Sequence, residues 1–152
     1  MLWDPTHGPF DLHDLVTLGG SSSEAAAIND AGRVVGWASD QGGTLHGFCL
    51  DLAGGTVRHL GGTVESLATG VNEAGLVIGR YKYSWLTDHP LAWNPAADAV
   101  ADLNDGISQD AGWTMFEAWG VNDTGQVTGF GTAVIDGIYH QRGYLLTPRP
   151  AS

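Results

Sequence analysis

A block of twelve residues occurs three times in this chain, and it constrains the fold more than any other feature of the sequence. The three copies begin at Ala25, Ala68 and Ala118, so they are spaced by 43 and 50 residues. They share the pattern Ala-x-[Ala/Gly]-[Ile/Val]-Asn-[Asp/Glu]-[Ala/Thr]-Gly-x-Val-x-Gly, with five of the twelve positions identical in all copies. Self-similarity at such a period is typical of tandem repeats, in which each unit packs on its neighbours.

The centre of each block has the composition of a tight turn between two strands. Its Asn can bond the backbone two residues further on, and the glycine that follows accepts the left-handed conformation that closes a hairpin with a bulge. Short apolar, β-branched runs such as Val34-Val35 lie beside the turn. We therefore expect three β-hairpins, with positive φ at Gly32, Gly75 and Gly125. The glycines that end the blocks predict a bulge or a close backbone contact at Gly36, Gly79 and Gly129.

Two further elements recur in register with the blocks. Leu-Gly-Gly, at Leu18 and Leu60, precedes a hairpin, and an aromatic-aliphatic strand occurs four times. The copies of that strand are Met1-Leu2-Trp3, Phe48-Cys49-Leu50, Leu91-Ala92-Trp93 and Tyr144-Leu145-Leu146. Each unit thus carries about four short strands in roughly 45 residues, which is the period of a propeller blade.

The sequence therefore predicts an all-β fold of three tandem four-stranded repeat units, propeller-like, made of blade-type antiparallel sheets. We expect one repeat domain over residues 1–148, with units at about 1–45, 46–88 and 89–141, a closing strand at 142–148 and a tail at 149–152. The third unit is longer because residues 107–115 are inserted ahead of its hairpin. Insertions in repeat proteins map to loops on one face, so we expect a surface loop beside the binding site.

Composition agrees with this fold and argues against one class of partner. Charged residues make up only 15% of the chain, whereas it contains 23 Gly and six Trp, which favours short strands and tight turns. The net charge is −11, and the six Lys and Arg residues are scattered along the chain. Because nucleic-acid binding depends on Lys and Arg that neutralise phosphates, we expect no nucleic-acid partner.

Several features bear on the environment of the protein. Cys49 is the only cysteine, so no disulfide can form within the chain, and its apolar neighbours predict a buried thiol. No apolar run approaches the roughly 20 residues of a membrane-spanning helix, and the N-terminus lacks the pattern of a signal peptide. The histidines show no metal-ligand spacing, so we expect no metal and no cofactor.

The units resemble the HAF repeat family, the probable extracellular repeats named after a His-Ala-Phe signature. The resemblance rests on His46-Gly47-Phe48 with Leu50, on the Leu-Gly-Gly elements and on the repeated Asn-turn blocks, and it spans Met1 to about Pro148. It implies a propeller-like β array, an extracellular location and no shared catalytic residues. The chain departs from the family in its lack of a secretion signal and in holding three units plus a final strand.

The aromatic residues that break the repeat are the strongest candidates for a binding site, because aromatics at loop ends suit contacts with carbohydrate, peptide or protein. These candidates are Trp85, Trp113, Phe116, Trp119 and Tyr139. The competing interpretation is that they fill core gaps between unequal units.

A second candidate set is cationic. His46 and His89 lie two residues before the aromatic-aliphatic strand in successive units, and Arg142 takes that position in the fourth copy. One interpretation makes them a ring of cations near a common axis. The other has each side chain bonded to a neighbouring strand or turn. The repeat-equivalent acids are expected to be solvated turn residues: Asp30, Glu73 and Asp123.

The leading functional hypothesis is a non-enzymatic binding or assembly module whose partner is a protein surface, a glycan or a second copy of the chain. One alternative is a small enzyme of lyase or cyclase type, with a pocket formed by the repeat array; another is a fragment of a longer array. Propellers close with about four to eight blades, and three units fall short of that range, so we expect a homodimer.

Overall fold

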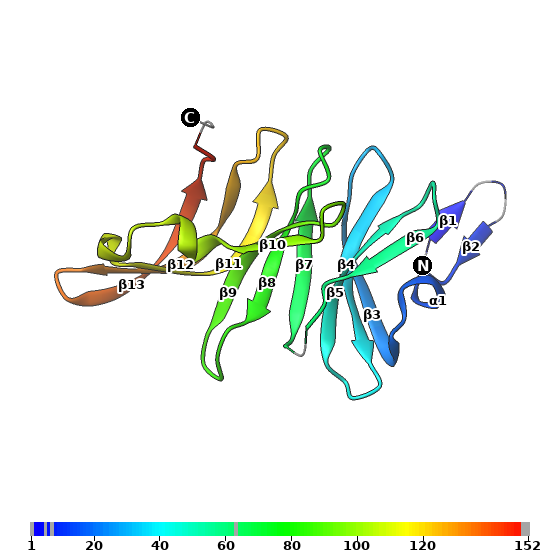
Figure 1. Cartoon of the computed structure of the whole chain (residues 1–152), viewed down its shortest axis with the longest axis horizontal. Helices are drawn as coiled ribbons and strands as arrows, with labels where there is room; N and C mark the ends of the chain where they lie inside the picture. Colours follow the sequence, from blue (N-terminus) through cyan, green and yellow to red (C-terminus); the bar gives the residue numbers. More distant parts are fainter. Residues whose placement is uncertain (1, 5, 7, 63, 150–152) are drawn as a thin grey trace.

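Three antiparallel sheets of this protein follow one another in a row, and a two-stranded sheet precedes them at the N-terminal end (Figure 1). The computed structural model describes residues 2–4, 6, 8–62 and 64–149. The first sheet contains β3 (Gly19–Ile28), β4 (Arg33–Asp40), β5 (Leu45–Asp51) and β6 (Thr56–His59). The second contains β7 (Ser66–Val71), β8 (Val77–Lys82), β9 (Asp88–Asn94) and β10 (Ala99–Asp102). The third contains β11 (Trp113–Val121), β12 (Val127–Ile135) and β13 (Ile138–Leu146).

Each repeated block is the turn of the first hairpin of a sheet, as the sequence predicts. Gly32, Gly75 and Gly125 have φ of 78°, 83° and 79°, so the prediction of left-handed glycines is confirmed. The first strand of each hairpin contains a β-bulge at the equivalent place, beside Ala25, Ala68 and Ala118. The glycines that end the blocks lie opposite these bulges, where a Cβ would clash with a carbonyl oxygen of the first strand.

The sheets stack by placing the first strand of one sheet on the face of the sheet before it. β7 packs against β3, β4 and β5, and β11 packs against β7, β8 and β9. Successive side chains along the second strand of each sheet point to opposite faces, so they contact the elements that pack on the two sides of that sheet. Val35 faces the second sheet and Val77 faces the first, and both are fully buried in one core cluster. Ile78 then faces the third sheet, where it meets Val127.

The Asn of each turn also joins one sheet to the next. Asn72 Oδ1 accepts from Leu76 N–H at 2.9 Å within its own turn, and Asn72 Nδ2 donates to the carbonyl oxygen of Asn122 at 3.0 Å. Asn29 Nδ2 donates to the carbonyl oxygen of Asn72 at 2.9 Å in the same way. Two of the acids that follow an Asn take part too: Glu73 accepts from Asp30 N–H at 2.7 Å, and Asp123 accepts from Glu73 N–H at 3.0 Å. A polar ladder therefore runs through the three turns, and the expectation of merely solvated turn acids is wrong for Glu73 and Asp123.

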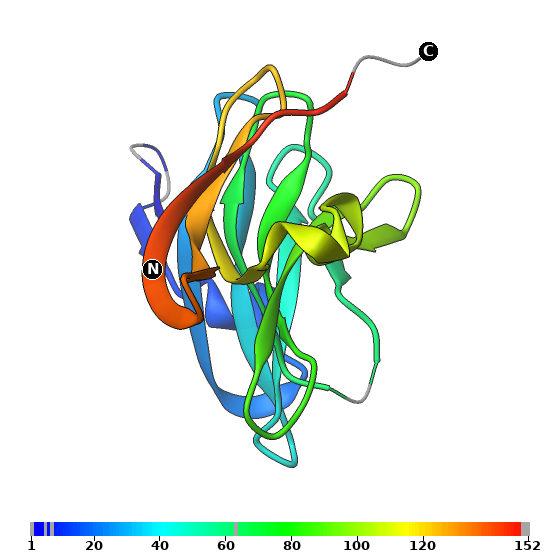
Figure 2. The same cartoon turned by 90° about the vertical axis from the view of Figure 1, so that its left-hand side faces the viewer.

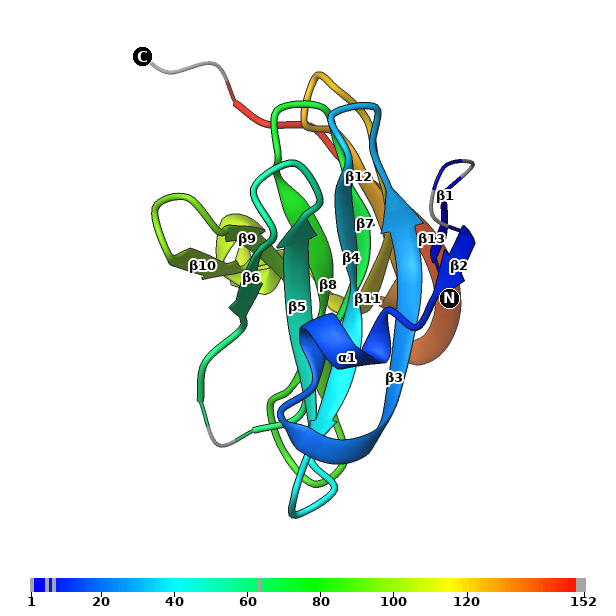
Figure 3. The same ribbon diagram turned by 90° about the vertical axis from the view of Figure 1, so that its right-hand side faces the viewer.

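Helix α1 (His13–Val16) lies on the other side of the first sheet. It follows β1 (Leu2–Asp4) and β2 (Gly8–Phe10), which pair with each other. Figure 3 shows α1 lying across the first sheet. Leu12 and Val16 pack on Val34 and Phe48 in a second buried cluster, and the Val16 carbonyl oxygen lies 2.8 Å from the Nε2 atom of His59.

Three details of the structure differ from the sequence-based expectation. The third sheet has three strands rather than four, and the aromatic-aliphatic strands lie third in their sheets, as β5, β9 and β13, rather than at the start of a unit. Within the described chain the row does not close into a ring, since β13 and the N-terminal hairpin lie at opposite ends (Figure 1). Met1 and residues 150–152 of the expected tail lie outside the described residues.

The predicted insertion is only partly a loop. Two 3-10 turns, η1 (Leu103–Gly106) and η2 (Gln109–Ala111), lead into β11, so Trp113 to Met115 belong to a strand. Met115 is buried, and Asn104 binds both its N–H and its carbonyl oxygen, each at 2.9 Å. The reason is that the strand begins earlier than the repeat pattern suggests, because it pairs with the long strand β12.

Candidate functional site

The face of the third sheet that points away from the second sheet is rich in exposed apolar side chains. Trp119 is 57% exposed and Leu145 is 61% exposed. The ring centroid of Phe130 lies 5.0 Å from that of Trp119 and 5.9 Å from that of Phe116. We call this surface the outer face and define it by Phe116, Trp119, Thr128, Phe130, Val134, Tyr139 and Leu145. Figure 2 looks onto this end of the row, where β13 curves past the other strands.

Comparison with the other two sheets explains why this face is exposed. Val35 and Ile78 stand at one repeat position, and each is buried by the sheet that follows. In the third sheet Thr128 occupies that position and is exposed. The ladder of turns also ends here, because Asn122 Nδ2 bonds to the Oε1 atom of Gln126, 2.8 Å away in its own turn. The outer face is therefore the surface on which a further sheet would pack.

The predicted aromatic site residues do not form one cluster. Phe116, Trp119 and Tyr139 lie on the outer face, although Tyr139 sits near the far tip of β13. Trp85 lies in the turn between β8 and β9 and is 97% exposed. Trp113 pairs with the buried Ala133 on the opposite face of the sheet and lines a cavity of about 330 Å³ beside Met115.

The three residues of the predicted cationic set occupy equivalent positions in their sheets, but each side chain bonds to groups near it rather than to a common site. His46, His89 and Arg142 face Ala38, Tyr81 and Gly131 of the neighbouring strands, respectively. His46 Nε2 lies 3.1 Å from an oxygen of Asp40, and His89 Nδ1 lies 2.5 Å from Asp102 Oδ2. Arg142 is exposed and donates to the carbonyl oxygen of Gln141. These contacts match the interpretation in which each side chain bonds to its own surroundings.

The pKa values of Asp102 and Tyr81 depart from their usual ranges, and the contacts of the two side chains explain both shifts. Burial alone would raise the pKa of Asp102, but hydrogen bonds from His89, Tyr81 and the Asn104 N–H outweigh burial and hold that pKa below its usual range. Burial and the same carboxylate raise the pKa of Tyr81. Tyr83 stacks on His89 with ring centroids 3.9 Å apart. The Asp102 carboxylate therefore stays ionised near neutral pH and accepts hydrogen bonds from His89 and Tyr81.

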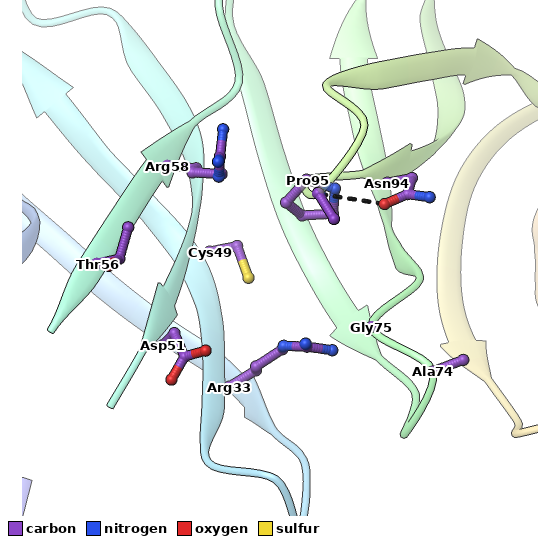
Figure 4. A pocket seen from close by; sticks show the side chains of 10 residues that line it. Arg33, Cys49, Asp51, Thr56, Arg58, Ala74, Gly75, Asn94 and Pro95 are labelled. Carbon is purple, nitrogen blue, oxygen red and sulfur yellow. Dashed lines mark hydrogen bonds between the residues drawn. The ribbon is translucent and has the colours of Figure 1, made fainter. Parts of the chain in front are cut away.

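Two equivalent grooves lie between successive sheets. The first, between the first and second sheets, has a volume of about 320 Å³ (Figure 4). Its walls are Arg33, Cys49, Asp51, Thr56, Arg58, Ala74, Gly75, Asn94, Pro95 and Ala96. The second groove, of about 590 Å³, has Leu76, Ala92 and Ala101 at the positions of Arg33, Cys49 and Arg58. Two chemically different cavities thus occupy the same place in the repeat.

Sequence reasoning missed several of these residues. Phe130, Val134 and Leu145 were not singled out, because their exposure depends on the absence of a covering sheet. The signal that points to them is the polar Thr128 at a position that is Val35 and Ile78 in the other blocks. The pairing of Arg33 with Arg58 in one groove has no sequence signal, since it depends on the strand register.

Among the described residues, no three His, Cys, Asp or Glu side chains gather in a way that could hold a metal ion. That part of the chain also contains no helix with the length and apolarity needed to cross a membrane. No family model, no curated protein and no solved structure matches the chain.

Proposed function

We propose that this protein is a non-enzymatic binding and assembly module that self-associates through the outer face of its third sheet. The observation that carries the proposal is the exposure of Thr128 and Leu145 in the third sheet. At the position of Thr128 the first two sheets have the buried Val35 and Ile78, and at the position of Leu145 the first sheet has the buried Cys49. Contiguous exposed apolar surface of this kind marks interaction sites in soluble proteins. Trp and Tyr, the residue types enriched in interface hot spots, are both present on it.

A second copy, placed by a two-fold axis, fits this surface better than a head-to-tail stack. The face of the first sheet that would receive another sheet is already covered by Leu12 and Val16. Within the part of the chain that the structure describes, nothing covers the outer face, so two outer faces can meet and form a closed, symmetric contact. Because Gln126 already satisfies the amide of Asn122, the ladder needs no acceptor from the partner.

Charge also favours this contact. The chain carries a net charge of −11, which makes most pairings of its surfaces repulsive. The seven residues that define the outer face are all uncharged. The nearby Glu117 is bound by Arg80 of the second sheet at 3.1 Å and by the indole N–H of Trp119 at 2.7 Å. Two outer faces can therefore approach without placing unpaired carboxylates against each other.

Sedimentation equilibrium at micromolar concentration tests the proposal. We expect a mass of twice the 15.9 kDa of the chain. Trp119→Ser and Leu145→Glu should shift the protein to monomer, since loss of a central anchor costs about 2 kcal/mol or more, roughly a thirtyfold change in Kd.

Matched controls exist on the β8–β9 turn. Trp85 and Leu86 are 97% and 94% exposed but lie off the outer face, so Trp85→Ser and Leu86→Glu should leave the mass unchanged. A wild-type mass of one chain, or equal effects of both pairs of variants, would contradict the proposal.

A further inference from the structure

The first inter-sheet groove carries two positive side chains in a strongly acidic protein. Arg33 begins β4 and Arg58 lies in β6, and both line the same cavity (Figure 4). The chain has six Lys and Arg residues against 17 Asp and Glu residues. Within the described residues, no carboxylate oxygen lies within 4.0 Å of either guanidinium. By contrast Arg80, elsewhere in the fold, contacts three carboxylates.

The acid among the lining residues, Asp51, also holds a turn through one of its oxygens. Asp51 Oδ1 accepts from the N–H groups of Ala53 and Gly54, at 3.0 and 3.3 Å, and so holds the turn after β5. Figure 4 shows the Arg33 side chain extended from the first sheet toward the turn of the second. It reaches there because residue 75 is glycine, where a Cβ would overlap the Nη1 atom of Arg33.

Comparison between the two grooves shows that the fold does not need these arginines. The strand register places Leu76 at the position of Arg33 and Ala101 at that of Arg58. The second groove is formed with those apolar residues, so the stacking of sheets is compatible with either set. Two arginines therefore replace apolar residues at a place where, among the residues that the structure describes, neither forms an ion pair.

We propose that the groove between the first and second sheets binds a small oxyanion through Arg33 and Arg58. A guanidinium group suits carboxylate and phosphate oxygens because its N–H groups donate in a planar fork. The cavity volume of about 320 Å³ is at the lower end of ligand pockets, so it suits a small molecule. The Asp51 carboxylate lies in the same wall, so the two guanidinium groups leave one net positive charge in the groove. The shared chemistry is a small oxyanion, either a phosphate group or a small carboxylate compound.

Calorimetric titration of the full chain tests this, with inorganic phosphate and succinate as separate probes at constant ionic strength. We expect saturable binding of one anion per chain by at least one of them, and the stronger of the two identifies the ligand class. Arg33→Leu and Arg58→Ala copy the second groove, so they should fold, and each should weaken binding about tenfold or more.

Arg142→Ala is the matched control, because it removes the same charge from an exposed site on the third sheet. It should leave anion binding unchanged. Thermal unfolding checks that all variants fold, and Arg33→Lys with Arg58→Lys should retain part of the affinity. Absence of saturable binding to both probes would overturn the proposal, as would equal weakening by Arg142→Ala or wild-type binding by both groove variants.

The unique thiol gives a second measurement. Cys49 lies in the wall of the groove, so a bound anion should slow its reaction with a neutral thiol reagent in the wild type and not in the Arg33→Leu variant. This site is independent of the outer face. Groove variants should keep the dimer mass, and Trp119→Ser should keep anion binding, so each proposal can fail alone.

Discussion

The ladder of asparagines makes a quantitative prediction about which turn matters most. Asn72 is the middle rung and is nearly fully buried. Asn72→Ala removes the acceptor of Leu76 N–H and the donor to the Asn122 carbonyl oxygen, two bonds of 2.9 and 3.0 Å. A net hydrogen bond contributes about 1 kcal/mol, and a buried group left without a partner costs about 1–3 kcal/mol. We therefore expect Asn72→Ala to lower the free energy of unfolding by about 2–4 kcal/mol.

Asn122 is the matched control within the same chain. It makes the same turn bond, from Gln126 N–H at 2.9 Å, but it is exposed, and the other partners of its side-chain amide are the side chains of Gln126 and Thr124 in its own turn. Water can replace those partners, so Asn122→Ala should cost about 1 kcal/mol or less. The isosteric substitutions Asn72→Asp and Asn122→Asp separate the contribution of the turn bond from that of the bond between sheets. Asn72→Asp keeps the turn acceptor but loses the donor between sheets, and it should cost more than Asn122→Asp.

Urea unfolding at fixed protein concentration measures both differences. The shift in the urea midpoint converts to a difference in free energy if the slope of unfolding free energy against urea concentration is unchanged. An unchanged slope also indicates that the variants unfold as the wild type does. Equal costs for Asn72→Ala and Asn122→Ala would refute the reasoning. That result would mean that each Asn acts only within its own turn and that the bonds between sheets contribute nothing measurable.

Three further predictions follow from the structure. Gly75→Val should lower the free energy of unfolding in urea by about 1–2 kcal/mol through strain at positive φ. It should also weaken anion binding in calorimetry, because the valine side chain displaces Arg33. Gly32→Val is the control and should cause only the strain. Met115→Ala should lower the free energy of unfolding by about 2–5 kcal/mol, because that side chain is buried in the third sheet; a cost below about 1 kcal/mol would contradict its place in the core. The pKa of Asp102 is lower in the folded than in the unfolded chain, so its contribution to stability is present above about pH 4 and is lost as the pH falls through the folded pKa. Asp102→Asn should flatten that part of the profile of stability against pH, and an unchanged slope would count against the assignment.

Local chemistry made part of the fold predictable. The Asn and Gly of each block determine a turn by themselves, since the Asn side chain bonds its own backbone and only glycine takes positive φ without strain. The glycines of the three turns, the hairpins around them and the all-β class could therefore be predicted before any contact was known. The same holds for the close backbone contact at Gly36 and its equivalents, because the pattern requires a residue without a side chain there.

The candidate sites were less predictable, because each depends on what lies across from a residue rather than beside it in the chain. The aromatics that break the repeat were predicted as candidates, but Trp113 lies on the inner face of the third sheet whereas Trp119 is exposed on the outer face. The bulges in β11 determine which face each side chain occupies. Sequence spacing also could not show that Arg33 and Arg58 share a groove, since 25 residues and a strand separate them.

By itself, then, the sequence determined the turns, the strand-rich class and the period of the array, all of which arise from interactions within a few residues. Only the tertiary structure decided the number of strands in the third sheet, the second bond of each Asn and the exposure of the outer face. The physical reason is that an apolar strand face has the same local pattern whether or not another sheet covers it. Whether such a face is core or binding surface therefore depends on whether another sheet packs on it.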